Sequence, residues 1–213
     1  MLATKIYKDE WEVQSRLAHF GVTQQELMEI AVMTLGARAD SVPDDPCTAA
    51  GLLSYIFGTR YLRQLFRSRG WVKDSTSNIE SVINLETGDR IIYQNVDHAG
   101  LAYTSPRAIS SKGKASTDMV DTAQGRLFAD AEIPEVVSLA RIRSINSRVW
   151  YFCVAFSDDH VIAELSLPAT VTAGNFNGFL ERIFIGDSRR PEPTKVGGGG
   201  EPPIEFEPVI VRK

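Results

Sequence analysis

The stretch RVWYFCVAF, residues 148–156, constrains the fold most, because every position after its arginine is apolar or aromatic. Successive side chains of a β-strand point to opposite faces, so such a strand carries apolar groups on both faces. We therefore expect it to lie in the centre of a sheet. A second apolar run, HVIAELSLP at residues 160–168, follows after a short SDD turn, and the pair predicts a β-hairpin.

The first third of the chain has a helical pattern instead. Thr23 and Glu26 have the spacing of a capping box, in which each side chain accepts from the other's backbone amide. Apolar residues then recur with helical spacing, and Pro43 and Pro46 interrupt the pattern before a further helix over about 46–68. Residues 1–70 therefore predict a three-helix N-terminal bundle.

The remaining chain predicts a mostly antiparallel sheet of two hairpins over residues 71–190. SVINLETGDRIIYQNVD alternates around a turn at Gly88, which is the first hairpin signal. Residues 98–126 show no sustained period and predict a long loop. GNFNGFLERIFIGD has apolar residues at helical spacing and predicts a short helix. Residues 191–213 predict a flexible Pro/Gly linker and a tail strand. The expected fold class is α+β, with a helical bundle packed on the sheet.

Composition excludes several classes of protein. The chain has 213 residues, enough for a core without metal or disulfide, and a formal net charge of -4. That charge argues against a nucleic-acid-binding protein that is basic throughout. Cys47 and Cys153 lack metal-like spacing and are expected to be reduced thiols. No signal core or membrane-spanning run is present, so we expect a cytoplasmic protein without a membrane partner. We expect no cofactor and no bound metal.

The basic residues of the predicted third helix and those just after it suggest a binding surface. Arg60, Arg63 and Arg67 share one helix face, Arg69 and Lys73 follow, and residues 60–73 contain no acid. Guanidinium groups without internal partners favour a phosphate ligand. The alternative is pairing with acids of other helices, such as Glu26.

The basic, hydroxyl-rich stretch PRAISSKGKAST, residues 106–117, suggests a second phosphate contact, with Tyr103 available to stack on a base. It lacks the glycine pattern of a nucleotide-binding loop, and a plain solvated loop is the alternative. The candidate nucleic-acid-binding residues are Arg60, Arg63, Arg67, Arg69, Lys73, Tyr103, Arg107, Lys112 and Lys114.

Two enzymatic alternatives use scattered acids and histidines. A metal-dependent hydrolase would need Asp97, His98, His160 and Glu164 to converge from the two hairpins. A nuclease would use acids that flank the first hairpin. Those acids are Glu80, Glu86 and Asp89. No marked nucleophile is found: GxSxG, CxxC and HExxH are all absent. No catalytic residue is assigned, and we expect a binding protein in preference to an enzyme.

Four phrases carry a resemblance: GTRYLRQLFRSRGW, INLETGDRIIYQNVDHAG, SPRAISSKGKAS and AELSLPATVTAGNFNGFLERIFIG. Together they resemble a family of short uncharacterised proteins encoded by bacteria and phages. The resemblance covers roughly residues 58–186 and implies a prokaryotic cytoplasm and a role in phage conflict or mobile elements. It implies no catalytic residue.

The leading hypothesis is a non-enzymatic module that contacts nucleic acid or a protein partner through the basic helix and loop. The tail, residues 201–213, would supply a protein contact by adding a strand to a sheet edge. A third hypothesis is an assembly subunit whose arginine-rich face binds an acidic protein.

Overall fold

The structure, a computed structural model, describes residues 3–125 and 148–189, and the described chain is α+β. The helices are α1 (Glu10–Ala18), α2 (Gln24–Ala39), α3 (Ala49–Ser68) and α4 (Lys114–Gly125), with a 3-10 turn at Thr76–Asn78. The strands are β1 (Lys5–Tyr7), β2 (Val72–Asp74), β3 (Ser81–Ile83), β4 (Asp89–Asn95), β5 (Arg148–Ser157), β6 (His160–Thr172) and β7 (Asn175–Arg189).

The seven strands form one mixed sheet in the order β1-β7-β6-β5-β4-β3-β2. Both predicted hairpins are present, as β3–β4 and β5–β6, and β5 lies in the centre as expected. The expectation of two hairpins alone is wrong. β2 and β7 extend the two hairpins as antiparallel neighbours, β4 pairs with β5 in parallel, and β1 joins in parallel to β7.

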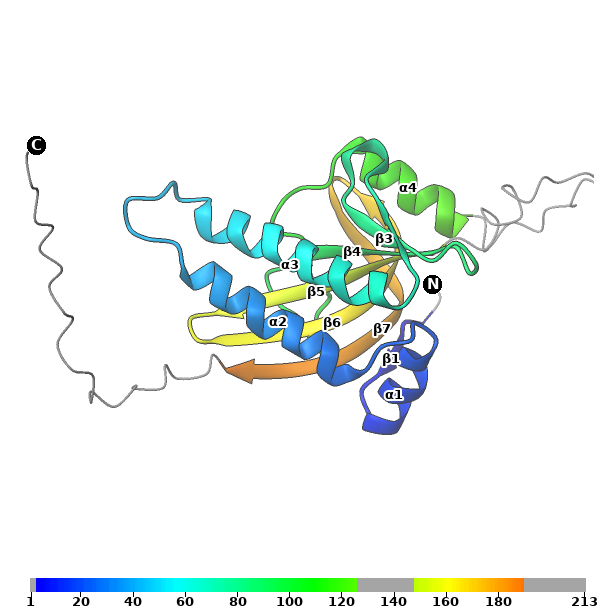
Figure 1. The fold of residues 1–213 in the computed structure, drawn as a ribbon. Coiled ribbons are helices and arrows are strands. Elements are labelled where there is room, and N and C mark those ends of the chain that lie inside the picture. Colours follow the sequence, from blue (N-terminus) through cyan, green and yellow to red (C-terminus); the bar gives the residue numbers. More distant parts are fainter. Residues whose placement is uncertain (1–2, 126–147, 190–213) are drawn as a thin grey trace, which may run out of the picture.

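The helices cover both faces of this sheet (Figure 1). One core contains Leu27 of α2 and Leu62 of α3 against Trp150 of β5. The core on the other face contains Val120 of α4 against Tyr151 of β5. The expectation of an N-terminal bundle packed on the sheet is met only in part: the helices pack on the sheet, but α1, α2 and α3 bury apolar side chains against the strands and do not form a clear bundle. Apolar spacing identifies a buried helix side but not its partner.

Local signals are confirmed where both partners lie close in sequence. The Thr23–Glu26 capping box is formed at the start of α2. The β3–β4 turn places Gly88 at a φ of 76°, a conformation that favours glycine. Two expectations are wrong: residues 114–125 form α4 within the predicted loop, and the predicted helix near Phe176 is strand β7. β7 pairs with β6 along almost its whole length, and sheet pairing of this kind overrides a helical spacing of a few residues.

The predicted linker and tail strand, residues 191–213, lie outside the described residues. None of the described helices has the length and apolar character that a membrane crossing requires.

Candidate functional site

Arg63, the middle one of the three arginines on α3, has its binding partners within the protein. Arg63 Nη2 donates to the Asp74 carbonyl at 2.9 Å, and Arg63 also forms an ion pair with Glu80. Its side chain is mostly buried between α3 and the β2–β3 edge. The expectation that this row has no internal partner is therefore wrong for Arg63, which anchors the helix to the sheet.

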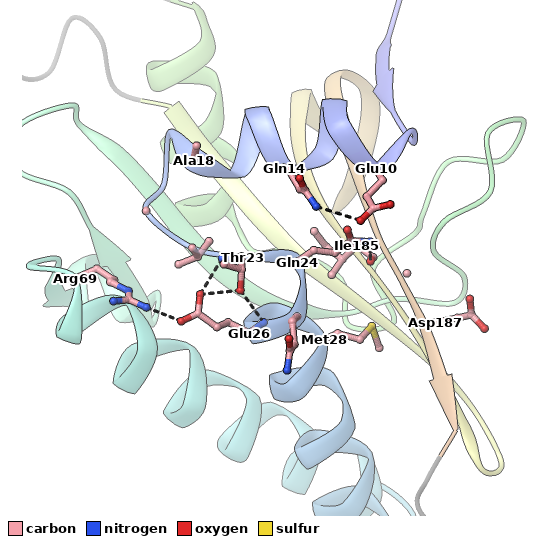
Figure 2. A pocket seen from close by; sticks show the side chains of 14 residues that line it. Glu10, Gln14, Ala18, Thr23, Gln24, Glu26, Met28, Arg69, Ile185 and Asp187 are labelled. Atoms are coloured by element: carbon pink, nitrogen blue, oxygen red, sulfur yellow. Dashed lines mark hydrogen bonds and ion pairs between the residues drawn. The ribbon is translucent and has the colours of Figure 1, made fainter.

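Arg69 is paired as well, with the capping carboxylate of α2 (Figure 2). The Thr23 backbone amide, followed by the Thr23 hydroxyl and Arg69, holds the pKa of the Glu26 carboxyl below its ordinary value. This pairing with an acid of another helix is the alternative that the sequence left open. Arg69 is thus committed to a contact between α2 and α3.

The remaining cations of the row face solvent. Arg60, Arg67 and Lys73 are all exposed. The Arg60 guanidinium lies 4.4 Å from the centre of the Phe57 ring on its own helix. Within the described residues Arg67 has no ion pair or hydrogen bond from its side chain. Two of the three helical arginines therefore stay available to a ligand.

The same side of α3 carries apolar groups that sequence spacing did not single out. Leu52 is 54% exposed, Ile56 is 47% exposed and Tyr55 is 37% exposed. Residues three, four, seven or eight apart lie on one side of a helix, so these three side chains lie on the same side of α3 as Arg60 and Arg67. We call Leu52, Tyr55, Ile56, Arg60 and Arg67 the α3 face.

Lys112 is not a solvated phosphate contact. Its Nζ donates to Gln94 Oε1 at 2.7 Å and lies 4.1 Å from the ring centre of Tyr151 and 4.6 Å from that of Phe176. Burial lowers the pKa of the Lys112 ammonium to about 8. An amine enclosed by aromatic rings and an amide is a packing group of the core beneath α4, and the prediction of an exposed cation is wrong here.

The lowered pKa makes folding pH-dependent. The folded state holds the Lys112 proton less tightly than the unfolded chain, whose lysine has a pKa of 10.5. The penalty on the charged form is complete below about pH 8, and it disappears as pH rises past the unfolded value. We expect the free energy of unfolding to rise by about 1–2 kcal/mol from pH 8 to pH 10 relative to Lys112→Met. Urea unfolding of both proteins across this range measures it. Parallel pH profiles would contradict it.

The other predicted loop residues differ in their contacts. Lys114 pairs with Asp118 within α4. Arg107 is exposed, and its backbone amide donates to Asp97. Tyr103 is fully exposed. The Val96–Ala108 bridge holds this loop beside β4. Lys114 is therefore paired within α4, while Tyr103 and Arg107 are exposed in the loop that follows β4.

The residues expected for a metal-dependent hydrolase do not converge. The Glu164 carboxylate is buried in a pair with Arg182, and His160 Nε2 lies 2.9 Å from Asp187. His98 Nδ1 lies 2.9 Å from the neighbouring Asp97. Across residues 3–125 and 148–189 no cluster of three histidine, cysteine or acidic residues is arranged to hold a metal ion.

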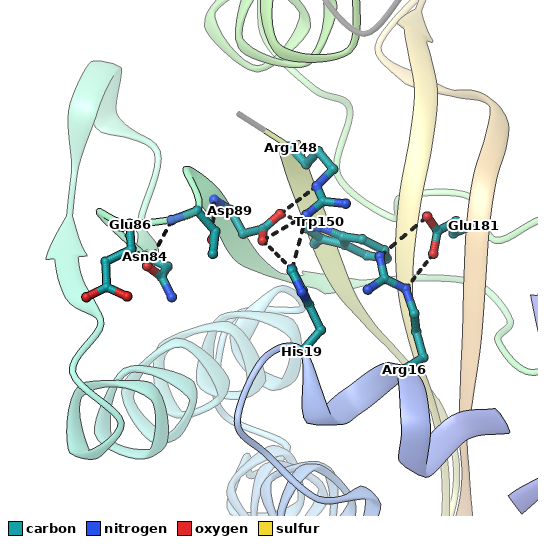
Figure 3. A network of polar contacts seen from close by, with 9 residues as sticks. Arg16, His19, Asn84, Glu86, Asp89, Arg148, Trp150 and Glu181 are labelled. Atoms are coloured by element: carbon teal, nitrogen blue, oxygen red, sulfur yellow. Dashed lines mark hydrogen bonds and ion pairs between the residues drawn. The ribbon is translucent and has the colours of Figure 1, made fainter. Parts of the chain in front are cut away.

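Two of the three acids proposed for a nuclease, Glu80 and Asp89, have internal partners. Glu80 binds Arg63, and Glu86 is an exposed turn residue. Asp89 is buried at the start of β4, where it accepts from Arg148 Nε at 2.9 Å and from Trp150 Nε1 at 3.2 Å (Figure 3). Glu80 and Asp89 thus have donors within the fold, and Glu86 lies apart from them in the exposed turn.

Sequence reasoning missed the histidine of this cluster. His19 Nε2, at the end of α1, lies 2.7 Å from Asp89 Oδ2 and 3.1 Å from an Arg148 nitrogen. The three residues come from α1, β4 and β5, and they join the first helix to the sheet. No pattern in the sequence pairs residues 70 and 129 positions apart. Because Asp89 accepts hydrogen bonds from several donors, we interpret the cluster as an ion network that stabilises the fold.

A groove lies between α1, the start of α2 and the end of β7 (Figure 2). It measures about 1050 Å³, and Glu10, Gln24, Met28, Ile185 and Asp187 are among its lining residues. The lining combines polar and apolar groups in about equal measure. We call this space the β7 groove.

Comparison with protein-family models, with curated proteins and with solved structures gives no significant match to this chain. The assignment of function therefore depends on the geometry described above.

Proposed function

We propose that this chain is a non-enzymatic binding module that docks an acidic protein partner through the α3 face. The observation that carries the proposal is the continuity of three exposed apolar side chains with two arginines, Arg60 and Arg67, on one side of one helix. A partner would bury the apolar groups and place carboxylates against the guanidinium groups.

The composition of the α3 face supports a protein ligand. Exposed apolar side chains that gather in one place mark interaction surfaces more often than they mark ordinary solvent-facing helix. Aromatic residues and arginine are enriched among the residues that dominate binding energy at protein interfaces. Tyr55, Arg60 and Arg67 are residues of this kind, and Leu52 and Ile56 supply apolar area between them.

The distribution of charge favours protein over nucleic acid. Arg63 and Arg69 are paired with Glu80 and Glu26, and Lys112 is enclosed beneath α4. The exposed residues Tyr103 and Arg107 lie in the loop after β4 and are not part of α3. A nucleic-acid surface would need more cations in one track than the α3 face offers. The setting that the resemblance implies for the partner is the cytoplasm of a bacterium or a phage-infected cell.

Site-specific crosslinking identifies the partner. A photoreactive residue at Ile56 in the source cell should capture one acidic protein, and the same residue at Leu85, exposed in the β3–β4 turn, should not. Capture of the same species at both positions, or of nucleic acid at Ile56, would count against the proposal.

Affinity measurements then test the arginines. We expect Arg60→Glu/Arg67→Glu to weaken binding of the captured partner roughly 100-fold, because each reversal places an acid against an acid. Arg107→Glu, an exposed charge reversal in the loop after β4 and outside the α3 face, should leave the dissociation constant unchanged. Labelled DNA and RNA are titrated over a salt series in parallel. Salt-dependent nucleic-acid binding that the double reversal abolishes would assign the α3 face to nucleic acid instead.

A further inference from the structure

The outer edge of β7 is paired over only part of its length. β1 pairs with it at Glu181–Ile183 and then turns into α1. From Phe184 to Arg189 no described strand lies on that side, while β6 pairs on the other. Unpaired strand edges present backbone donors and acceptors to any further strand.

A bulge shapes the start of this open edge. Ala163 pairs with Gly186 and Glu164 with Phe184, so Ile185 has no partner across β6. The Ile185 carbonyl instead accepts from Gln24 Nε2 of α2 at 2.6 Å. A side-chain amide thus takes the place that the backbone amide of a neighbouring strand would occupy. Regular pairing with β6 resumes at Gly186 and continues to the end of β7.

Two hollows lie beside this edge. The β7 groove lies at its start, between α1 and α2 (Figure 2). A second hollow of about 400 Å³ lies at its end; it is mostly apolar, lined by Met28, Val32 and Met33 together with Gln25 and Glu29 of α2 and Ser188 of β7. An apolar flank of α2 therefore follows the open strand. An added strand would find apolar contacts at the Ser188 end and space at the other.

The charge of the groove defines what fits there. Glu10 contributes a carboxylate to the groove, whereas Asp187, at the edge of the groove, directs its exposed carboxylate to the other face of β7, where it contacts His160. Arg69 at the same groove is neutralised by Glu26. The groove therefore favours a strand with apolar residues followed by cations.

The sequence of this chain contains such a segment, PVIVRK, residues 208–213. It has three consecutive β-branched residues, which favour strand, and then Arg212 and Lys213. We propose that residues 208–213 add to the open edge of β7 as an antiparallel strand. Val209 and Val211 then face the apolar flank of α2, Lys213 reaches Glu10 in the β7 groove, and Arg212 points to the other face of the sheet, where the Asp187 carboxylate lies.

The chain length permits this contact within one molecule. Residues 190–207 separate β7 from the segment, and a chain of this length spans roughly 60 Å when extended. Its four consecutive glycines allow it to reverse direction. Between two copies the same strand addition would make a dimer. The proposal concerns the β7 edge and is independent of the α3 face.

Hydrogen exchange of the full-length chain tests the added strand. We expect the amides of residues 184–189 to exchange at least about tenfold faster in Val209→Asp/Val211→Asp than in the wild type, because charges on that strand prevent its packing on α2. Thr194→Asp/Val196→Asp is the matched control, since it places the same charges before the glycines. Equal exchange in all three proteins would overturn the proposal.

A peptide experiment tests the same contact by addition. A labelled peptide of residues 208–213 should bind the Val209→Asp/Val211→Asp protein, and adding Glu10→Lys/Asp187→Lys to that protein should weaken its binding at least about tenfold. A scrambled peptide should not bind. Failure of the native peptide to bind would contradict the proposal. Light scattering then shows whether the wild-type contact lies within a monomer or between two copies.

Discussion

Replacing Arg182 by methionine is expected to lower the free energy of unfolding by about 3–5 kcal/mol. The Arg182 and Glu164 side chains are 2% and 0% exposed, and two nitrogens of the arginine donate to the carboxylate at 2.9 and 2.6 Å. Arg182 also donates to the Leu101 carbonyl, and Glu164 accepts from the Gly100 amide and from Ser166. Methionine keeps most of the volume but leaves the carboxylate charged and without its cation.

Urea unfolding at neutral pH measures this loss of unfolding free energy. Two further variants show whether the loss comes from the unpaired charge of Glu164. Glu164→Leu/Arg182→Met removes both charges and should recover more than half of the loss, because no unpaired charge stays buried. Lys114→Met removes a cation from the exposed pair with Asp118 and should change stability by less than about 0.5 kcal/mol. A loss below about 1 kcal/mol for Arg182→Met would show that water reaches the Glu164 carboxylate.

The strand that carries Arg182 shows which parts of the fold can be predicted from the sequence and which cannot. The expected fold class, the central strand and both hairpins depended on patterns within about twenty residues, and these are present. Thr23 and Glu26 likewise identify a helix start locally. Residues around Arg182 carry helical spacing too, and only their pairing with β6 makes them a strand. Pairing between distant segments leaves no periodic signal, so the place of β7 and β1 in the sheet could not be predicted.

The candidate site, like the fold, could be predicted from the sequence only in part. The α3 arginine row was recognised from spacing, yet spacing does not separate Arg67, which is exposed, from Arg63, which binds Glu80 in the following loop. Lys112 looked solvated because its neighbours in sequence are polar, whereas its neighbours in space are Tyr151 and Phe176. Charge patterns therefore located the arginines of the α3 face. The structure was needed to show which cations have internal partners and which exposed apolar side chains lie beside the others.

Gly58→Ala is expected to lower the free energy of unfolding by about 3 kcal/mol, although alanine favours helix over glycine. Gly58 lies in α3 where the helix crosses β4, and a Cβ atom there would approach the Tyr93 ring to 2.3 Å. The ring cannot move aside, because Tyr93 is buried, contacts the Phe152 ring and donates from its hydroxyl to Asn95. The helix would have to move away from the sheet and open its apolar contacts to β4.

Gly51 in the same helix separates this packing effect from backbone effects. A Cβ atom at Gly51 meets nothing within 4 Å, so Gly51→Ala should raise stability by up to about 1 kcal/mol. Tyr93→Leu gives Gly58→Ala room, and the double variant should be clearly more stable than the sum of the two single losses. Chemical denaturation of the wild type, the three single variants and the double variant provides this comparison. If both glycine variants were stabilised alike, α3 would not be held against β4 at Gly58, and the α3 face would lose its rigid support.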